Sequence, residues 1–99
     1  MPPRPDLESV QDILRTADVE GLIAEGAPAD EYEPEEALLL AAIQHLPSTE
    51  IHPATLMPIL ENIWHKSFAP TSSEMEERRT ALKSVAARIE HYFGQHSQY

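Results

Sequence analysis

The stretch EPEEALLLAAIQHLP, residues 33–47, decides the fold class of this 99-residue chain. Proline fits the first positions of a helix and carboxylates are favoured there by the helix dipole, so we expect a helix to begin at Pro34. Pro47 ends it, because the residue before a proline is driven out of the α region. The side chains between are apolar around most of the helix, apart from Gln44 and His45. We therefore expect this helix to be the most buried one, at the centre of the fold.

A first helix is predicted on the N-terminal side, over about Pro5–Ala17. Asp6 can accept the early backbone N–H bonds, and apolar residues recur along one face at spacings of three and four. Asp18 can then cap a short helical turn over Val19–Ala24, which Gly26 ends.

On the C-terminal side, residues 47–58 hold several prolines and predict a loop with one turn. Thr55 is expected to cap the next helix, with Pro58 in its first turn, where the missing N–H has no intrahelical partner to lose. This helix is expected to end near Phe68.

The last helix has two alternative capping boxes, Thr71 with Glu74 or Ser73 with Glu76. Its apolar residues recur at spacings of three, four or seven as far as Gly94, a natural helix stop. No stretch alternates as a strand does. The sequence thus predicts an all-α fold, a single small bundle of four main helices with a proline-rich loop between helices two and three.

Length and composition predict one domain over residues 1–99, with frayed ends at 1–5 and 94–99. The absence of cysteine excludes disulfides, thiolate metal sites and a cysteine nucleophile, and it fits a reducing cytoplasm. The longest apolar run, residues 37–43, is far shorter than the roughly 20 residues that span a bilayer. We therefore expect a soluble, cytoplasmic protein.

The net charge of −10 is concentrated in residues 16–65, which hold ten acids and no Lys or Arg. Such a chain repels phosphate, which argues against nucleic acid and against anionic membranes as partners. An acidic segment suits a basic protein partner, and it equally serves as protection against aggregation.

The sequence offers no convincing catalytic or metal site. The acidic run DEYEPEE, residues 30–36, has a proline inside it and lacks the ligand spacing and glycine of a calcium loop. The five histidines lack the spacing that puts two ligands on one helix face, and no serine lies in a GxSxG motif. We expect no catalytic residue, no metal ligand and no cofactor.

The aromatic residues have structural interpretations. Trp64 and Phe68 are four residues apart on an apolar helix face and are expected in the core. Tyr32 lies among carboxylates, so it is either an anchor that buries its ring and holds the loop or an exposed recognition residue. The anchor is favoured, because so charged a loop needs an apolar attachment.

Three segments, DVEGL at 18–22, GAPADEYEPE at 26–35 and ILENIWHKSF at 59–68, resemble a small bacterial domain-of-unknown-function family. Its members carry DPIGL, then DEYDPE, then an aromatic-rich helix. Val19 and Glu20 stand here where the family has Pro and Ile. The resemblance implies a small all-helical fold and brings no activity. It also implies one possible interaction surface, made by Asp18, Gly21, Leu22, Asp30, Glu31, Tyr32, Pro34 and Glu35, although the same residues could simply hold a loop in place.

Three functions remain open at the level of sequence. The first is a non-enzymatic protein-interaction or regulatory module, immunity-type or adaptor-like, that binds a basic protein through residues 18–36. The second is a metal-binding or enzymatic domain that uses histidines and carboxylates. The third is a structural domain that forms a homo-oligomer through apolar helix faces.

Overall fold

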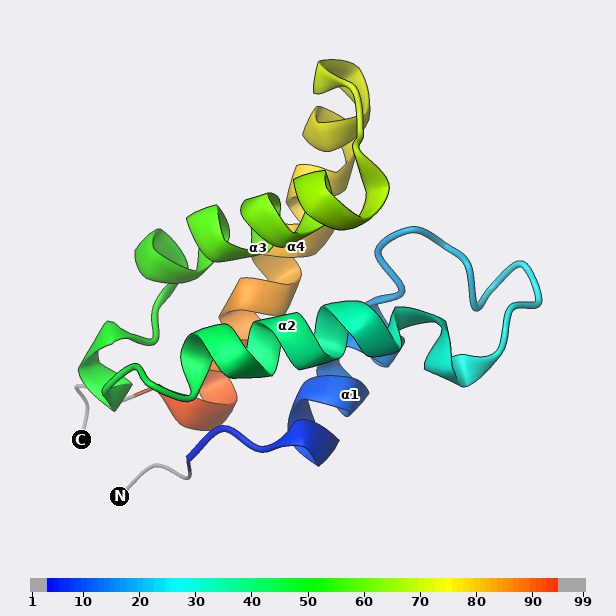
Figure 1. Cartoon of the computed structure of the whole chain (residues 1–99). Helices are drawn as coiled ribbons and strands as arrows, with labels where there is room; N and C mark the ends of the chain where they lie inside the picture. The colour runs from blue at the N-terminus through cyan, green and yellow to red at the C-terminus, as the bar shows by residue number, and fades with distance from the viewer. Residues whose placement is uncertain (1–3, 95–99) are drawn as a thin grey trace.

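The structure is a computed structural model that describes residues 4–94, apart from the side chains of residues 29 and 30. This part of the chain is all-α, as predicted, and contains no strand. Four α-helices and two short 3-10 helices follow one another (Figure 1): α1 (Leu7–Ala17), η1 (Ala29–Tyr32), α2 (Glu33–Ile43), η2 (Ser48–Glu50), α3 (Pro53–Phe68) and α4 (Ser72–Phe93).

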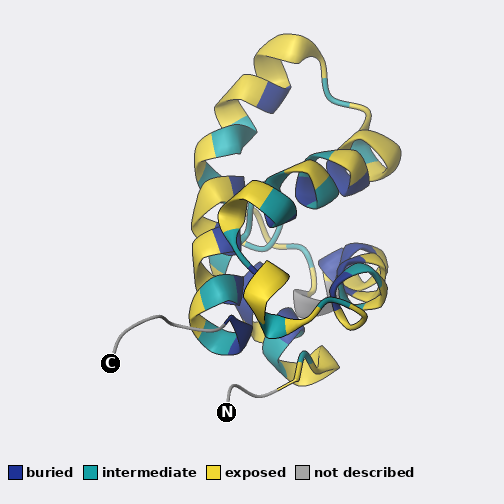
Figure 2. Ribbon diagram, turned by 90° about the vertical axis from the view of Figure 1, so that its left-hand side faces the viewer, coloured by how far each residue is buried: buried dark blue, intermediate teal, exposed yellow. Residues whose placement is uncertain are grey.

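The four helices pack in a ring, in which α1 contacts α2, α2 contacts α3, α3 contacts α4 and α4 contacts α1. The longest helix, α4, runs from the α3–α4 turn past the other helices to the opposite end of the molecule (Figure 1). Buried residues gather on the inward sides of the helices (Figure 2). All four helices and η1 contribute large, fully buried side chains, which include Ile13, Tyr32, Leu39, Leu60, Trp64, Leu82 and Phe93.

The first helix begins as its sequence predicts. The Asp6 carboxylate accepts a hydrogen bond from the Ser9 backbone N–H at 2.8 Å. At the other end, Asp18 adopts a left-handed conformation and its N–H donates to the Leu14 carbonyl. Residues 19–26 form a series of turns and not a helical segment, so the prediction of a helical turn over Val19–Ala24 is only partly met.

The second helix has the largest share of buried residues among the four helices, as predicted, but the expectation that it lies enclosed at the centre of the fold is not met. One side of α2 packs against α1 and α3, but the other side is exposed, and Leu38 keeps 46% of its surface. The helix ends at Ile43, and the Arg4 guanidinium donates to the carbonyls of Gln44 and Leu46 just beyond it. The apolar pattern shows which sides of a helix are suited to burial, but it does not show how many neighbouring helices are present to cover those sides.

The predicted loop over residues 47–58 is too long. The expected single turn is η2, but α3 already begins at Pro53, so Thr55 is not its cap and Pro58 lies at the sixth helical position. Pro53 fits the first helical position because its missing N–H has no partner there. Pro58 is tolerated inside the helix because it and Ala54, whose carbonyl it leaves without an intrahelical donor, are both exposed to water.

The last helix uses the first of its two predicted capping boxes. Thr71 accepts from the Glu74 N–H at 3.1 Å, and Glu74 accepts from the Thr71 N–H at 2.9 Å. The helix ends before Gly94, as predicted, and a Cβ at Gly94 would lie only 2.7 Å from the Ile51 and Glu90 carbonyl oxygens. This close approach requires glycine.

Of the ends expected to fray, only residues 4, 5 and 94 lie in the described part of the chain. Arg4 is hydrogen-bonded to the end of α2, and Gly94 is buried with its N–H donating to the Glu90 carbonyl. The rest of both predicted ranges falls outside the described residues. Within residues 4–94, no helix is both long enough and apolar enough to cross a membrane.

Candidate interaction site on the α1–α2 connection

The connection between α1 and α2 begins at Asp18, whose side chain orders the first turns. Its two carboxylate oxygens accept hydrogen bonds from the backbone N–H groups of Ile23 at 3.1 Å and Ala24 at 2.9 Å. Aspartate tolerates the left-handed backbone conformation that ends α1, and its short side chain can reach nearby backbone donors. One residue therefore ends α1 and organises the turns that follow.

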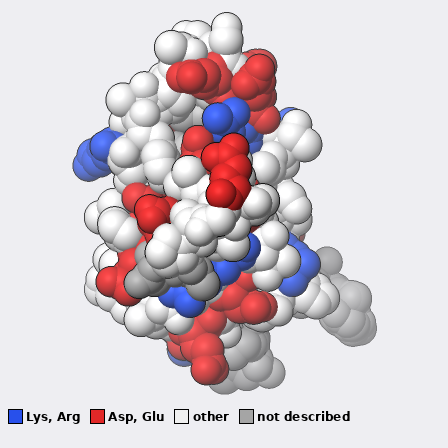
Figure 3. All heavy atoms as spheres, turned by 90° about the vertical axis from the view of Figure 1, so that its right-hand side faces the viewer, with Lys and Arg blue, Asp and Glu red and all other residues white. Residues whose placement is uncertain are grey.

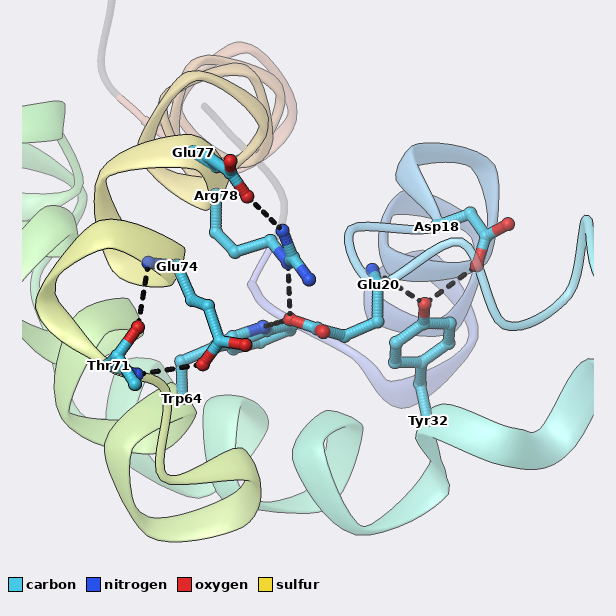
Figure 4. Close-up of polar contacts among 8 residues, drawn as sticks. All are labelled: Asp18, Glu20, Tyr32, Trp64, Thr71, Glu74, Glu77 and Arg78. Atoms are coloured by element: carbon cyan, nitrogen blue, oxygen red, sulfur yellow. Dashed lines mark hydrogen bonds and ion pairs between the residues drawn. The ribbon is translucent and has the colours of Figure 1, made fainter.

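The connection closes at Tyr32, which is completely buried. Its hydroxyl donates to Asp18 Oδ1 at 2.7 Å and accepts from the Glu20 backbone N–H at 2.9 Å (Figure 4). The interpretation of Tyr32 as an anchor is thus confirmed. The Tyr32 hydroxyl thus joins the end of the connection to its beginning at Asp18 and Glu20.

Glu20 attaches the same connection to the other half of the molecule. Its Oε2 accepts hydrogen bonds from the Trp64 indole Nε1 at 2.7 Å and from Arg78 Nε at 3.0 Å (Figure 4). The rings of Tyr32 and Trp64 are stacked with centroids 6.5 Å apart. We call Asp18, Glu20, Tyr32, Trp64 and Arg78 the loop cluster. It joins the α1–α2 connection to α3 and α4.

The hydrogen bonds of the loop cluster change the protonation of its members. Burial acts to raise the pKa of Asp18, but the bonds from the Tyr32 hydroxyl and the Ala24 and Ile23 N–H groups together hold it below its ordinary value of 3.8. The pKa of Tyr32 is raised, first by burial and then by its bond to Asp18. Asp18 is thus ionised and Tyr32 protonated at neutral pH, which is what the donor and acceptor roles require.

Two acidic residues in the first turn of α2 point inward. Glu36 is fully buried and receives two hydrogen bonds from the Arg15 guanidinium, at 2.9 and 3.2 Å. Glu35 keeps only 5% of its surface. Glu36 belongs to the packing between α1 and α2. Because both carboxylates are buried, they are unavailable to a partner.

The structure therefore divides the eight residues predicted to form one surface. Tyr32 and Glu35 are buried, and Asp18, Gly21 and Leu22 are half-buried. Glu31 and Pro34 are exposed, and the side chain of Asp30 lies outside the described residues. Any binding surface on this connection has to be made mainly by its exposed members.

Sequence reasoning missed Glu20, Arg78 and the Arg15–Glu36 pair. One signal was present, because a buried tryptophan needs an acceptor for its indole N–H. That argument does not say which acceptor it is. Among the described side chains, the acids that stay exposed on the connection and at the start of α2 are Glu25, Glu31 and Glu33.

Carboxylates spread over the side of the molecule that carries this connection, with Lys and Arg side chains between them (Figure 3). The described residues hold no group of three or more His, Asp or Glu side chains that could bind a metal ion. Among the histidines, His45, His65 and His91 are exposed and His52 is half-buried, and His96 lies outside the described part.

Comparison with known proteins adds no assignment. No protein family, no curated protein and no solved structure matches this chain. The resemblance to the small bacterial family, which depends on DVEGL at 18–22 and DEYEPE at 30–35, stays a prediction.

Proposed function

We propose that this protein is a non-enzymatic protein-interaction module that binds a basic protein partner through Glu25, Glu31 and Glu33. The observation that carries the proposal is that the loop cluster holds the connection between α1 and α2 while these three carboxylates remain exposed. A connection that is already ordered loses little conformational entropy on binding.

The charge of the partner follows from the composition of this segment. No Lys or Arg occurs between residues 16 and 65, so the exposed acids have no cation nearby in the sequence. Arg15 and Arg78, which reach the α1–α2 connection and the start of α2 from outside the segment, are engaged by Glu36 and Glu20. Carboxylates exposed in this way attract Lys and Arg side chains and accelerate association with a basic surface.

The test compares two charge-neutralised variants as affinity baits in an extract of the source organism. The first carries Glu25→Gln, Glu31→Gln and Glu33→Gln. The control carries Glu8→Gln, Asp12→Asn and Glu50→Gln, three exposed acids elsewhere, so both variants have the same net charge. We expect a protein retained by the wild type and the control and lost from the first variant.

The retained protein is then purified and its affinity measured at several salt concentrations. A basic protein whose affinity falls with salt, and which binds the first variant at least about tenfold more weakly than the control, supports the proposal. Equal binding to both variants would show that only net charge matters. That result, or an acidic partner, would overturn it.

A further inference from the structure

The outer face of α2 carries an exposed apolar stripe. Pro34, Ala37, Leu38 and Ala41, which we call the α2 stripe, follow one another at helical spacing and are all exposed. Leu38 keeps 46% of its surface, and the other large hydrophobic residue so exposed in residues 4–94 is Leu7, at 44%. The stripe is about 10 Å long, given a rise of about 1.5 Å per helical residue.

This exposure disagrees with the sequence of α2. A helix that is apolar on both sides is normally buried on both sides. Here α1 and α3 pack against one side, whereas the side that carries Leu38 is exposed among the described residues. Contiguous exposed apolar surface is one of the features that mark sites where another protein binds.

The shape of the α2 stripe suits a helix as its occupant. Ala37 and Ala41 are small and lie beside the larger Leu38, so a partner helix can approach closely with its side chains on either side of that leucine. Amphipathic helices dock on such surfaces through side chains spaced three and four residues apart.

The charges at the two ends of α2 indicate the chemistry and direction of that helix. Glu31 and Glu33 are exposed at the N-terminal end, whereas Arg4 is bound to the carbonyls at the C-terminal end. A second copy of this chain is disfavoured as the occupant, because each copy carries a net charge of −10. A helix with Lys or Arg at one end complements the surface.

We propose that the α2 stripe docks an amphipathic helix of a basic partner, with the partner's apolar side chains around Leu38 and its Lys or Arg side chains over Glu31 and Glu33. The inference rests on the proposed function for the charge of the partner. It adds the apolar contact, which the proposed function does not need.

The test uses two synthetic Leu/Lys peptides of the same composition, one patterned as an amphipathic helix and one scrambled. Binding to the full-length protein is measured by fluorescence anisotropy. The variants are Leu38→Gln, Ala41→Gln, the matched control Leu7→Gln, and the pair Glu31→Gln with Glu33→Gln. Thermal melts establish that each variant is folded, and the two stripe variants guard against the failure of either one to fold.

We expect Leu38→Gln and Ala41→Gln to weaken binding of the amphipathic peptide about tenfold, because an apolar contact is lost, while Leu7→Gln changes it less than about twofold. Binding of the scrambled peptide should be unaffected by all three. The inference would be overturned if the Glu31 and Glu33 variant lost binding of both peptides while the stripe variants bound them as the wild type does. That result would leave the proposed function standing.

Other outcomes are equally decisive. If the Glu31 and Glu33 variant binds both peptides as the wild type does, the proposed function fails. If light scattering shows a dimer that Leu38→Gln converts to a monomer, the occupant is a second copy and the docking of a basic helix is overturned.

Discussion

Of the three connections between the four helices, the first and the last are built in opposite ways. The long one, residues 18–32, is held by side chains that reach it from α3 and α4, with Trp64 and Arg78 bound to Glu20. The short one, residues 69–71, is held by backbone geometry and by the capping box of Thr71 with Glu74.

This difference indicates where substitutions lower the stability of the fold most. In the long connection the side chains of the loop cluster are partly or fully buried, so removing one leaves its partner without a hydrogen bond and away from water. In the short connection the groups are exposed, and water replaces what a mutation removes. Substitutions in the long connection should therefore have the larger effects.

The largest effect is expected for Tyr32→Ala, which deletes a fully buried ring and the hydroxyl that joins Asp18 to Glu20. We expect a loss of about 3–5 kcal/mol in the free energy of unfolding. Tyr32→Phe keeps the ring and should lose only about 1–2 kcal/mol. Urea denaturation followed by the fluorescence of the single tryptophan measures both, and a loss below about 1 kcal/mol for Tyr32→Ala would contradict the anchor role.

Glu20→Ala comes next, because it removes the acceptor for both the Trp64 indole and the Arg78 guanidinium. We expect a loss of about 2–3 kcal/mol and a changed emission spectrum of Trp64 in the folded protein. Glu20→Gln is the control, since its amide oxygen can still accept from the indole, and it should be less destabilising. Equal losses in the two variants would show that the indole bond contributes little.

The lowered pKa of Asp18 predicts that the stability of the protein depends on pH. Its pKa is lower in the folded protein than the ordinary value of 3.8, so its contribution to stability is present above that pH and is lost as the pH falls through the folded pKa. The stability difference between the wild type and Asp18→Asn should be greatest near neutral pH and shrink in acid. Denaturation curves across this range measure it, with Asp12→Asn as an exposed control, and a difference that does not change with pH would refute the role of the charge.

The features that the sequence predicts are local ones, and the features that it misses depend on contacts between distant parts of the chain. The Asp6 cap of α1, the capping box of α4 and the stop at Gly94 depend on residues close together in the chain. Local rules found the cap and the stop, and they left the Thr71 box as one of two alternatives. The exposure of α2 and the start of α3 at Pro53 depend on which helices pack together, and local rules missed them.

The candidate site divides likewise. Tyr32 was recognisable as an anchor because an aromatic ring among carboxylates has few other structural roles. Glu20 was not, because its partners Trp64 and Arg78 lie 44 and 58 residues away in the chain. Nothing local in DVEGL indicates that its glutamate faces a tryptophan.

In the short connection, Thr71→Ala should lose about 1 kcal/mol, the usual effect of removing an N-cap side chain. Ser73→Ala alters the alternative capping box, which the structure does not use, and should change stability by less than about 0.5 kcal/mol. Thermal melts of the two variants compare them directly. A larger loss for Ser73→Ala would mean that α4 starts from the other box in solution.

The smallest effect is expected in the opposite direction, for Ala69→Gly. Ala69 ends α3 with φ 44° and ψ 52°, a left-handed conformation that is unfavourable for a residue with a Cβ. Glycine relieves that strain but makes the unfolded chain more flexible, so we expect a net gain of about 0.5–1 kcal/mol. Ala87→Gly, the same change at an exposed position inside α4, should instead lose about 1 kcal/mol. If both variants lose stability equally in chemical denaturation, backbone conformation does not hold the short connection, and its contrast with the long one fails.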